Sequence, residues 1–244
     1  MQHKRYYNNK VCLNVLANSV ENAKEIYHTA EGHAVIGLLA SNYTDVDKAV
    51  DDVQLYGEAI DRAISLGLGG GDPNQWKMVT DICRKVTPEH INQVFPAVAY
   101  TRACVQNETS HINCLVNPAE TPGYVNIATG PMSAQEPAVN IPIRSAITLI
   151  SEMGGNAIKL FPMNGLAMRQ HYVKIAEACG EAGFILEPTG GITVDNFEEI
   201  VSLALEAGVP KVIPHVYSSI MDPDTGITRV EAIKKLFKIM KKIG

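Results

Sequence analysis

Short runs of apolar residues recur along the chain and alternate with longer segments whose apolar residues follow helical spacing. Because a helix repeats every ~3.6 residues and a strand every two, the runs predict buried strands and the segments between them predict amphipathic helices. The predicted core strands are residues 11–16, 34–39, 66–68, 91–95, 112–116, 157–161, 184–187 and 211–214. Such alternation is typical of a parallel sheet with right-handed crossovers.

Other local signals refine this arrangement. Residues 117–139 are the least regular part of the chain, and 124–127 predict an additional strand that forms a hairpin with the fifth core strand. Polar residues ahead of apolar segments predict helix N-caps, with Ser19 before the first helix and capping boxes that open at Asp195 and Thr228.

The number of strand–helix units decides between two architectures. Eight units in 244 residues favour a closed (β/α)8 TIM barrel that forms a single domain over residues 1–244. A doubly wound open sheet is the alternative. That fold usually carries a glycine-rich nucleotide fingerprint after the first strand, whereas this chain has Ala17, Asn18 and Ser19 there. The barrel is therefore the preferred prediction.

Composition excludes several classes of function. A formal net charge of −5 gives no electrostatic reason to expect nucleic acid or an anionic membrane as a partner. No stretch approaches the ~18 consecutive apolar residues of a membrane span. The five cysteines are scattered and form no CxxC pair, which favours reduced thiols and a cytoplasmic location. We expect no cofactor and no metal, because the histidine spacing calls for none, although a histidine–carboxylate site can still assemble from separate strands.

The most informative residue is Lys159, in the middle of the predicted strand 157–161. Strand side chains alternate, so Lys159 shares one face with Ala157 and Phe161. Burial disfavours the ammonium form, and the free amine that results can attack a carbonyl carbon and form a Schiff base. The alternative is structural: Lys159 reaches water or pairs with a carboxylate.

A barrel carries its chemistry at the C-terminal ends of its strands, and the loops after strands seven and eight are its usual phosphate site. Thr189, Gly190 and Gly191 follow the seventh strand, and Ser218 follows the eighth. Paired glycines let the backbone approach a ligand and direct N–H groups at an anion. These four residues are therefore candidate phosphate-binding groups, although Gly-Gly pairs also form simple turns and serines also cap helices.

The loop after the third strand contains three consecutive glycines, which favour close approach of the backbone to a ligand. We include Gly70, Gly71 and Asp72 among the candidate substrate-binding residues, although Asp72 also has the position of an N-cap.

Glu187 and His215 are candidate proton-transfer residues. Glu187 has the same strand parity as Thr189, so both side chains point to the same side. His215 has an ordinary pKa near neutrality. The structural alternatives are a salt-bridge partner for Glu187 and a hydrogen-bonded core position for His215.

Two segments resemble a known group of enzymes. Lys-Leu-Phe-Pro at 159–162 and Pro-Thr-Gly-Gly-Ile at 188–192 are similar to motifs of class I aldolases of the 2-keto-3-deoxy-6-phosphogluconate and 4-hydroxy-2-oxoglutarate type. The lysine of that group forms the Schiff base, and its glycine turn binds the substrate phosphate. A divergent branch, the KDGP aldolase family, resembles the chain nearly end to end. The segments that carry this resemblance are 69–75, 90–96, 187–191 and 213–219.

The resemblance implies a (β/α)8 lyase of sugar-acid breakdown that is a homo-oligomer. Its substrate is a small keto acid, 2-keto-3-deoxy-6-phosphogluconate or 4-hydroxy-2-oxoglutarate, and its products are pyruvate with glyceraldehyde 3-phosphate or glyoxylate. One feature departs from the classical enzymes, which place a glutamate base near the second strand, because residues 34–39 contain no acid. The base is then expected elsewhere, with Glu187 as the first candidate and His215 as the second.

Two alternative functions remain open at this point. One is a metal-dependent aldolase on the same fold, in which Lys159 is only an ion-pair partner. The other is a non-catalytic protein that binds sugar phosphates.

Overall fold

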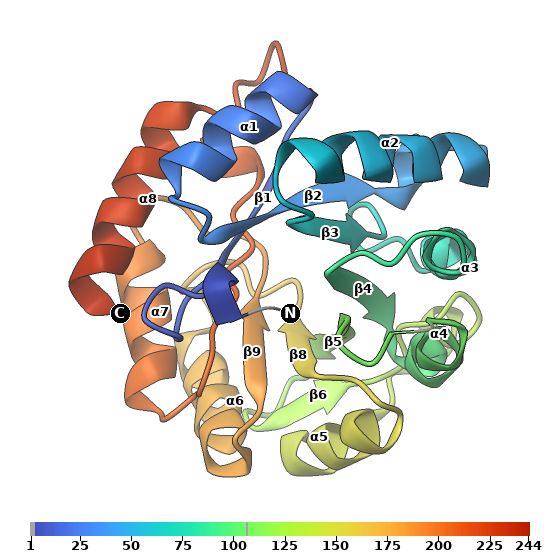
Figure 1. Ribbon diagram of the computed structural model, residues 1–244. Helices are drawn as coiled ribbons and strands as arrows, with labels where there is room; N and C mark the ends of the chain where they lie inside the picture. Colours follow the sequence, from blue (N-terminus) through green and yellow to red (C-terminus); the bar gives the residue numbers. More distant parts are fainter. Residues whose placement is uncertain (1–2, 106) are drawn as a thin grey trace.

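The computed structural model describes residues 3–105 and 107–244 and shows a parallel α/β fold. Its sheet curls inside a surrounding ring of helices (Figure 1). The parallel strands pair in the order β1-β2-β3-β4-β5-β8-β9. Their bounds are β1 (Leu13–Leu16), β2 (Ala34–Leu39), β3 (Ile64–Gly67), β4 (His90–Val94), β5 (His111–Pro118), β8 (Ala157–Leu160) and β9 (Ile185–Pro188).

The predicted eighth core strand takes a less regular form. Within the described chain, residues 211–214 form no continuous strand, but isolated parallel bridges connect this segment to both edges of the curled sheet. Backbone N–H groups of Cys12 and Asn14 donate to it from the β1 side, at 3.1 and 3.0 Å. The bridged pairs are Val212–Val11, Val212–Leu186, His215–Asn14 and His215–Thr189.

Helices cover the outside of the sheet, and most pack against their neighbours in the ring. Their amphipathic spacing explains this placement, because each buries one apolar face and exposes the other. Their bounds are α1 (Val20–Thr29), α2 (Val46–Ala59), α3 (Trp76–Cys83), α4 (Val98–Cys104), α5 (Ile143–Glu152), α6 (Arg169–Ala182), α7 (Phe197–Glu206) and α8 (Val230–Ile243). None of the helices in the described ranges is long and apolar enough to cross a membrane.

The irregular segment after β5 forms a small antiparallel extension. β6 (Tyr124–Asn126) pairs with the end of β5, which confirms the predicted hairpin, and β7 (Asn140–Pro142) pairs with β6. The sequence did not predict β7. Its three residues are exposed or only partly buried, so they lack the apolar pattern by which a strand is detected.

Helix capping follows the prediction at α1 and departs from it elsewhere. The Ser19 hydroxyl accepts a hydrogen bond from the Asn22 amide at 3.1 Å and caps α1. The predicted capping boxes are wrong, because no cap hydrogen bond comes from the side chain of Asp195 or Thr228. Thr193 and Asn196 bond each other's backbone amides ahead of α7 instead.

The inner face of the curled sheet is unusually polar. Side chains on this face form hydrogen bonds between strands that are not neighbours, so they lie inside the curve of the sheet. Nearly all of their polar groups are hydrogen bonded. The buried polar residues on this face are Asn14, Ser65, His90, Asn92, His111, Asn113, Lys159, Glu187 and His215. Buried polar groups are costly without partners, so this interior has a purpose beyond packing.

The N-terminal segment covers the sheet at the end where the strands begin. The helical turn η1 (His3–Arg5) lies near the middle of the ring (Figure 1). Arg5 is buried and forms an ion pair with Glu89 at 2.8 Å, just before β4, and its guanidinium donates to the Tyr27 hydroxyl at 2.6 Å. This cover leaves the opposite end, where the strands finish, as the approach to the interior.

Candidate active site

Lys159 lies in the middle of β8, between β5 and β9, and only 8% of it is exposed. Its ammonium nitrogen Nζ donates to Asn92 Oδ1 at 2.9 Å. Among the described residues no ion pair joins it to a carboxylate, so neither structural alternative for this lysine matches its surroundings. Burial lowers the pKa of Lys159 to about 8, and the negative charge of Glu187 opposes part of that shift. A usable fraction of free amine is therefore present near neutral pH.

A cavity of about 110 Å³ adjoins Lys159 at the C-terminal end of the strands. Its wall consists of apolar side chains, a glycine-rich loop and three side chains that carry exchangeable protons. The lining residues are Leu16, Leu39, Gly67, Leu68, Gly69, Gly70, Gly71, Lys159, Phe161, Thr189 and Tyr217. The glycines give it a wall without side chains, which makes room for a small ligand beside the amine.

A larger hollow of about 540 Å³ lies elsewhere, beside α2 and the segment that precedes β4. Its amine is Lys85, which is hydrogen bonded to Asp47, and that bond raises the pKa of Lys85. A raised pKa removes the nucleophile that a Schiff base needs. Chemistry therefore selects the smaller cavity next to Lys159 as the candidate site.

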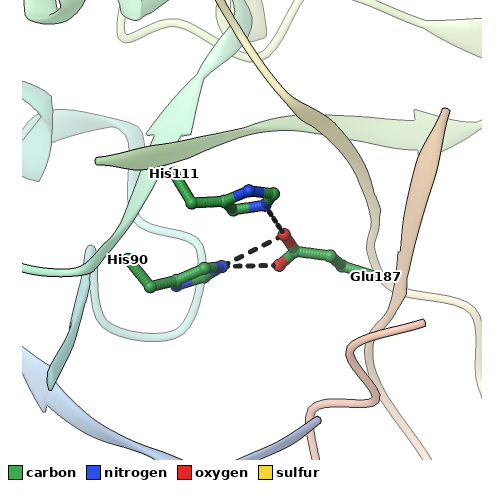
Figure 2. A group of neighbouring side chains, drawn as sticks. All are labelled: His90, His111 and Glu187. Atoms are coloured by element: carbon green, nitrogen blue, oxygen red, sulfur yellow. Dashed lines mark hydrogen bonds and ion pairs between the residues drawn. The ribbon is translucent and has the colours of Figure 1, made fainter. Parts of the chain in front are cut away.

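Glu187 on β9 is fully buried and is the centre of a hydrogen-bonded cluster. Figure 2 shows the rings of His90 and His111 directed at its carboxylate. His111 Nε2 lies 2.9 Å from Oε1, His90 Nε2 lies 3.1 Å from both oxygens, and His215 Nε2 lies 2.8 Å from Oε2. The Asn113 amide also donates to Oε2, at 2.6 Å. Four donors satisfy the lone pairs of one carboxylate.

This cluster contains an anion surrounded by donors. Burial acts to raise the pKa of Glu187, but the charge interaction with His90 and the three histidine hydrogen bonds outweigh it and hold that pKa well below the ordinary range. Burial lowers the pKa of His111 to about 4. Burial and then the positive charge of Lys159 lower the pKa of His215 to about 3. Glu187 is therefore ionised at neutral pH, whereas His111 and His215 are neutral.

The same cluster has the donor set of a metal site. Ligand atoms of His90, His111 and Glu187 lie within 4.8 Å of one another, and two imidazoles with a carboxylate suit zinc or a similar divalent ion. The hydrogen bonds described above also satisfy these atoms without an ion. Ser65 Oγ lies 2.8 Å from His90 Nδ1 and fixes that ring from its other side.

The glycine turn after β9 packs against the chain itself. Gly190 and Gly191 have φ of +99° and +72°. A Cβ on Gly191 would lie 2.5 Å from the Gly165 nitrogen, and the Gly165 amide donates to the Gly190 carbonyl at 2.9 Å. The two glycines therefore let the loop after β8 lie directly on the loop after β9, which positions both beside Lys159.

The other predicted binding residues have varied environments. Gly70 and Gly71 line the cavity, and the space beside Gly71 is filled by the Phe161 ring. Asp72 accepts a hydrogen bond from the Asn74 amide at 2.9 Å, which lowers the pKa of Asp72 and marks it as a cap. Ser218 is exposed, whereas its neighbour Ser219 donates to the Ile192 carbonyl at 2.6 Å and links the two loops.

The structure thus brings some predicted residues together and separates others. Lys159, Thr189, Gly70 and Gly71 share the cavity, whereas Glu187 and His215 lie in the buried cluster. The remaining candidates, Asp72, Gly190, Gly191 and Ser218, are not among the residues of the cavity wall.

Sequence reasoning missed several residues of the polar interior and one of the cavity wall. They are His90, Asn92, His111, Asn113 and Tyr217. A signal for four of them was present, because β4 and β5 both begin His-Ile-Asn, at 90–92 and 111–113. Polar residues at every second position of two apolar strands indicate a polar inner face.

Comparison with known proteins gives the class to which this fold and site belong. A family model described as KDGP aldolase matches residues 7–224, and the chain belongs to that family. It is also 42% identical to the 2-dehydro-3-deoxy-phosphogluconate aldolase of Salmonella typhimurium (strain 14028s / SGSC 2262), over 100% of both chains.

Solved structures with much lower identity share the fold. One described as "Native KDPGal structure" has a TM-score of 0.55 at 11% identity, over 96% of this chain and 95% of that one. The tryptophan synthase complex from Pyrococcus furiosus has a TM-score of 0.55 at 13% identity, over 96% and 98%. The carboxyl transferase domain of Rhizobium etli pyruvate carboxylase with 3-bromopyruvate has a TM-score of 0.56 at 12% identity, over 98% and 48%. Identities this low indicate a common architecture only.

Proposed function

We propose that the protein is a class I aldolase that cleaves 2-keto-3-deoxy-6-phosphogluconate, or the related 4-hydroxy-2-oxoglutarate, into pyruvate and an aldehyde. One observation carries this proposal: the buried Lys159 amine lies beside a small cavity, has its pKa lowered to about 8, and has no carboxylate partner among the described residues. The name of the 42% identical relative supports the same reaction. The activity belongs to the carbon–carbon lyases.

In this mechanism the Lys159 amine attacks the C2 ketone of the substrate. Loss of water leaves an iminium whose positive nitrogen accepts the electron pair as the C3–C4 bond breaks. The C4 hydroxyl gives up its proton in that step and becomes the aldehyde carbonyl. The enamine left on Lys159 gains a proton at C3, and water then releases pyruvate and restores the amine.

A phosphate on the substrate needs an anion site at the cavity mouth. We propose that Thr189, backbone N–H groups of Gly190 and Gly191, and Ser218 supply it, because these residues belong to the loops that follow β9 and the 211–214 segment. The exposed hydroxyl of Ser218 is available to such a group. A substrate that is too large for the 110 Å³ cavity then extends from Lys159 toward these loops.

A second candidate function is a metal-dependent aldolase, which the arrangement of His90, His111 and Glu187 favours. In that case His90, His111 and Glu187 would hold the ion, which would supply Lewis-acid polarisation of a carbonyl, and Lys159 would only balance charge. The two candidates differ in what they require, since the first depends on the Lys159 amine and the second on the ion.

We further propose that the sheet is a closed (β/α)8 barrel in one domain, supported by the bridges from Val212 and His215 to both sheet edges. The five cysteines are all free thiols, which supports a cytoplasmic enzyme. By the resemblance to related aldolases we expect a homo-oligomer, which light scattering on the purified protein measures directly.

The test is pyruvate release from each keto acid by the wild type and by Lys159→Met. Methionine keeps the length of the side chain and removes the amine, so we expect activity to fall by at least ~10³-fold. Lys174→Met is the matched control, because Lys174 is exposed and forms a surface ion pair with Glu177.

Full activity in Lys159→Met together with loss of activity after chelation would favour the metal-dependent mechanism. Stabilisation of the wild type by sugar-acid phosphates without any turnover would identify a binding protein instead.

A further inference from the structure

We propose that Tyr217 is the side chain that exchanges a proton with the substrate, and that His215 and Glu187 form a relay behind it. This inference rests on the proposed aldolase function. In this proposal the substrate contacts the Tyr217 phenol and does not contact Glu187 or His215 directly. Neither the sequence patterns nor the comparisons give Tyr217 a role.

The cavity wall offers few groups that can carry a proton. Of the residues that line it in the described chain, only Lys159, Thr189 and Tyr217 have exchangeable side-chain protons. Lys159 is the nucleophile, and the Thr189 hydroxyl donates to the backbone carbonyl of Glu187 at 3.2 Å. Tyr217 is partly exposed and faces the same cavity as the amine. Tyr217 is therefore the wall residue that links the cavity to a side chain able to take up a proton, because its hydroxyl lies beside His215.

Tyr217 is connected directly to the buried anion. Its hydroxyl lies 2.9 Å from His215 Nδ1, and His215 Nε2 lies 2.8 Å from Glu187 Oε2. An ionised carboxylate only accepts hydrogen bonds, so His215 carries its proton on Nε2 and presents a lone pair on Nδ1. That lone pair is aimed at the Tyr217 hydroxyl, which is the arrangement of a nucleophile, a base and an orienting carboxylate in a triad.

The surroundings hold this chain in place. The Tyr217 hydroxyl also lies 3.1 Å from Asn14 Oδ1, and the Asn14 amide donates to Ser65 Oγ at 2.9 Å and approaches His215 Nε2 at 3.4 Å. Three further donors, from His90, His111 and Asn113, keep the carboxylate ionised. Of the two acceptors beside the Tyr217 hydroxyl, only the His215 imidazole can take up its proton, because an amide oxygen is not a base at neutral pH.

The proton balance of the cleavage step follows. As the C3–C4 bond breaks, its electron pair moves toward the iminium nitrogen and the C4 hydroxyl proton passes to the Tyr217 oxygen. The original Tyr217 proton passes to His215 Nδ1, and the imidazolium that results is stabilised by Glu187. The reverse transfer returns a proton through Tyr217 to C3 of the enamine. One proton thus moves from the C4 oxygen to the pyruvate methyl group, and no other reactant is consumed.

The test uses Tyr217→Phe, which removes one oxygen and keeps the ring. We expect pyruvate still to be trapped on Lys159 by borohydride, because imine formation does not need the phenol. Turnover and the exchange of pyruvate methyl protons with deuterium oxide should both fall by about 10²–10⁴-fold. Tyr172→Phe is the control, since Tyr172 is a buried phenol that donates to the Ile200 carbonyl in the helical layer. It should leave trapping, exchange and turnover unchanged.

A second variant, His215→Gln, tests the relay. If the two residues act in series, the double variant should exchange protons about as slowly as the slower single variant, not at the product of the two losses. Methyl exchange at the wild-type rate in a folded Tyr217→Phe that still traps pyruvate would overturn the proposal. Loss of trapping in that folded variant would also overturn it, because the phenol would then serve imine formation. Absence of trapping in the wild type would instead reject the aldolase function itself.

Discussion

The charge state of Lys159 is set by two opposing effects at the scale of single residues. Burial removes water from the ammonium group and lowers its pKa, whereas the Glu187 anion acts in the other direction. Glu187 does not form an ion pair with Lys159, because its oxygens are already engaged by three histidines and Asn113. The negative charge of Glu187 therefore acts on the pKa of the Lys159 amine, although the two groups form no ion pair.

This balance predicts the pH dependence of imine formation. Only the free amine attacks a ketone, so the rate of pyruvate trapping should rise with pH, reach half its maximum near pH 8 and level off above it. An ordinary lysine would give a midpoint near pH 10.5. Trapping with cyanoborohydride across pH 6 to about 11 measures this. A midpoint above about 10 would show that burial does not lower the pKa of Lys159.

Removal of the Glu187 charge should destabilise the protein. Glu187→Gln removes the negative charge and replaces one acceptor oxygen with an NH2 donor that faces other donors, and breaking a buried charged network costs about 3–5 kcal/mol. Chemical denaturation at pH 7 measures the loss. Glu181→Gln is the control, because Glu181 is 58% exposed on a surface ion pair and should change stability by no more than about 0.5 kcal/mol.

The direction in which stability changes with pH gives a second test of whether Glu187 is ionised. Its pKa in the folded protein lies well below the ordinary value of 4.5, so its contribution is present above that pH and is lost as pH falls toward the folded pKa. The stability difference between wild type and Glu187→Gln should therefore shrink below pH ~4.5. A difference that stays constant from pH 7 into acid would contradict an ionised Glu187.

At the scale of elements, the apolar pattern was sufficient for seven strands and for the lysine in β8, but it failed where structure depends on distant partners. β7 has no buried face of its own and exists because it pairs with β6. Thr228 was predicted to cap a helix, but its hydroxyl donates to the Leu16 carbonyl across the fold. The sequence of one segment does not show which distant part of the chain that segment contacts in the fold.

Some residues of the candidate site could be predicted from local sequence, and others could not. Lys159 and the two glycine-rich loops could be found because a charge or a glycine run interrupts an apolar pattern. Glu187 and His215 were predicted as candidates, but His90 and His111 were missed. The four residues come from three separate strands and from the residue that follows the 211–214 segment, and only the curvature of the sheet brings them together. The repeated His-Ile-Asn in β4 and β5 was the available clue.

The contact between the loops after β8 and β9 predicts a specific effect of Gly191→Ala. The added Cβ would lie 2.5 Å from the Gly165 nitrogen and 2.8 Å from the Asn164 carbonyl carbon, and backbone atoms cannot move aside cheaply. We expect the loops to separate and the free energy of unfolding to fall by about 2–4 kcal/mol.

Gly183→Ala is the matched control for this prediction. Gly183 has a similar φ of +63°, and nothing lies within 4 Å of its added Cβ. Its cost should be the backbone strain alone, about 1–2 kcal/mol. Equal losses in the two variants, measured by denaturation, would show that the close approach of the loops does not matter.

At the scale of the whole molecule, the sheet encloses a polar interior that is closed by the N-terminal segment and open where the strands end. The helical layer supplies the apolar core, so the inner face is available for chemistry. The interior contains one lysine, one carboxylate and three histidines among the described residues of its inner face. This combination supports both imine chemistry and metal binding, and the two must be separated experimentally.

Removal of any bound metal distinguishes the imine mechanism from the metal-dependent mechanism. Because hydrogen bonds satisfy His90, His111 and Glu187 without an ion, we expect dialysis against a chelator to leave turnover and pyruvate trapping unchanged. Elemental analysis of the purified protein before and after dialysis accompanies the assay. A stoichiometric ion whose removal abolishes turnover, and whose return restores it, would contradict this expectation.

Imine formation at Lys159 is tested by reducing the protein with borohydride in the presence of pyruvate and mapping its peptides by mass spectrometry. We expect one modified residue, Lys159, and no modification when pyruvate is left out or when Lys159 is replaced by methionine. A protein that turns over its keto acid substrate but shows no adduct, or an adduct on another lysine, would contradict it.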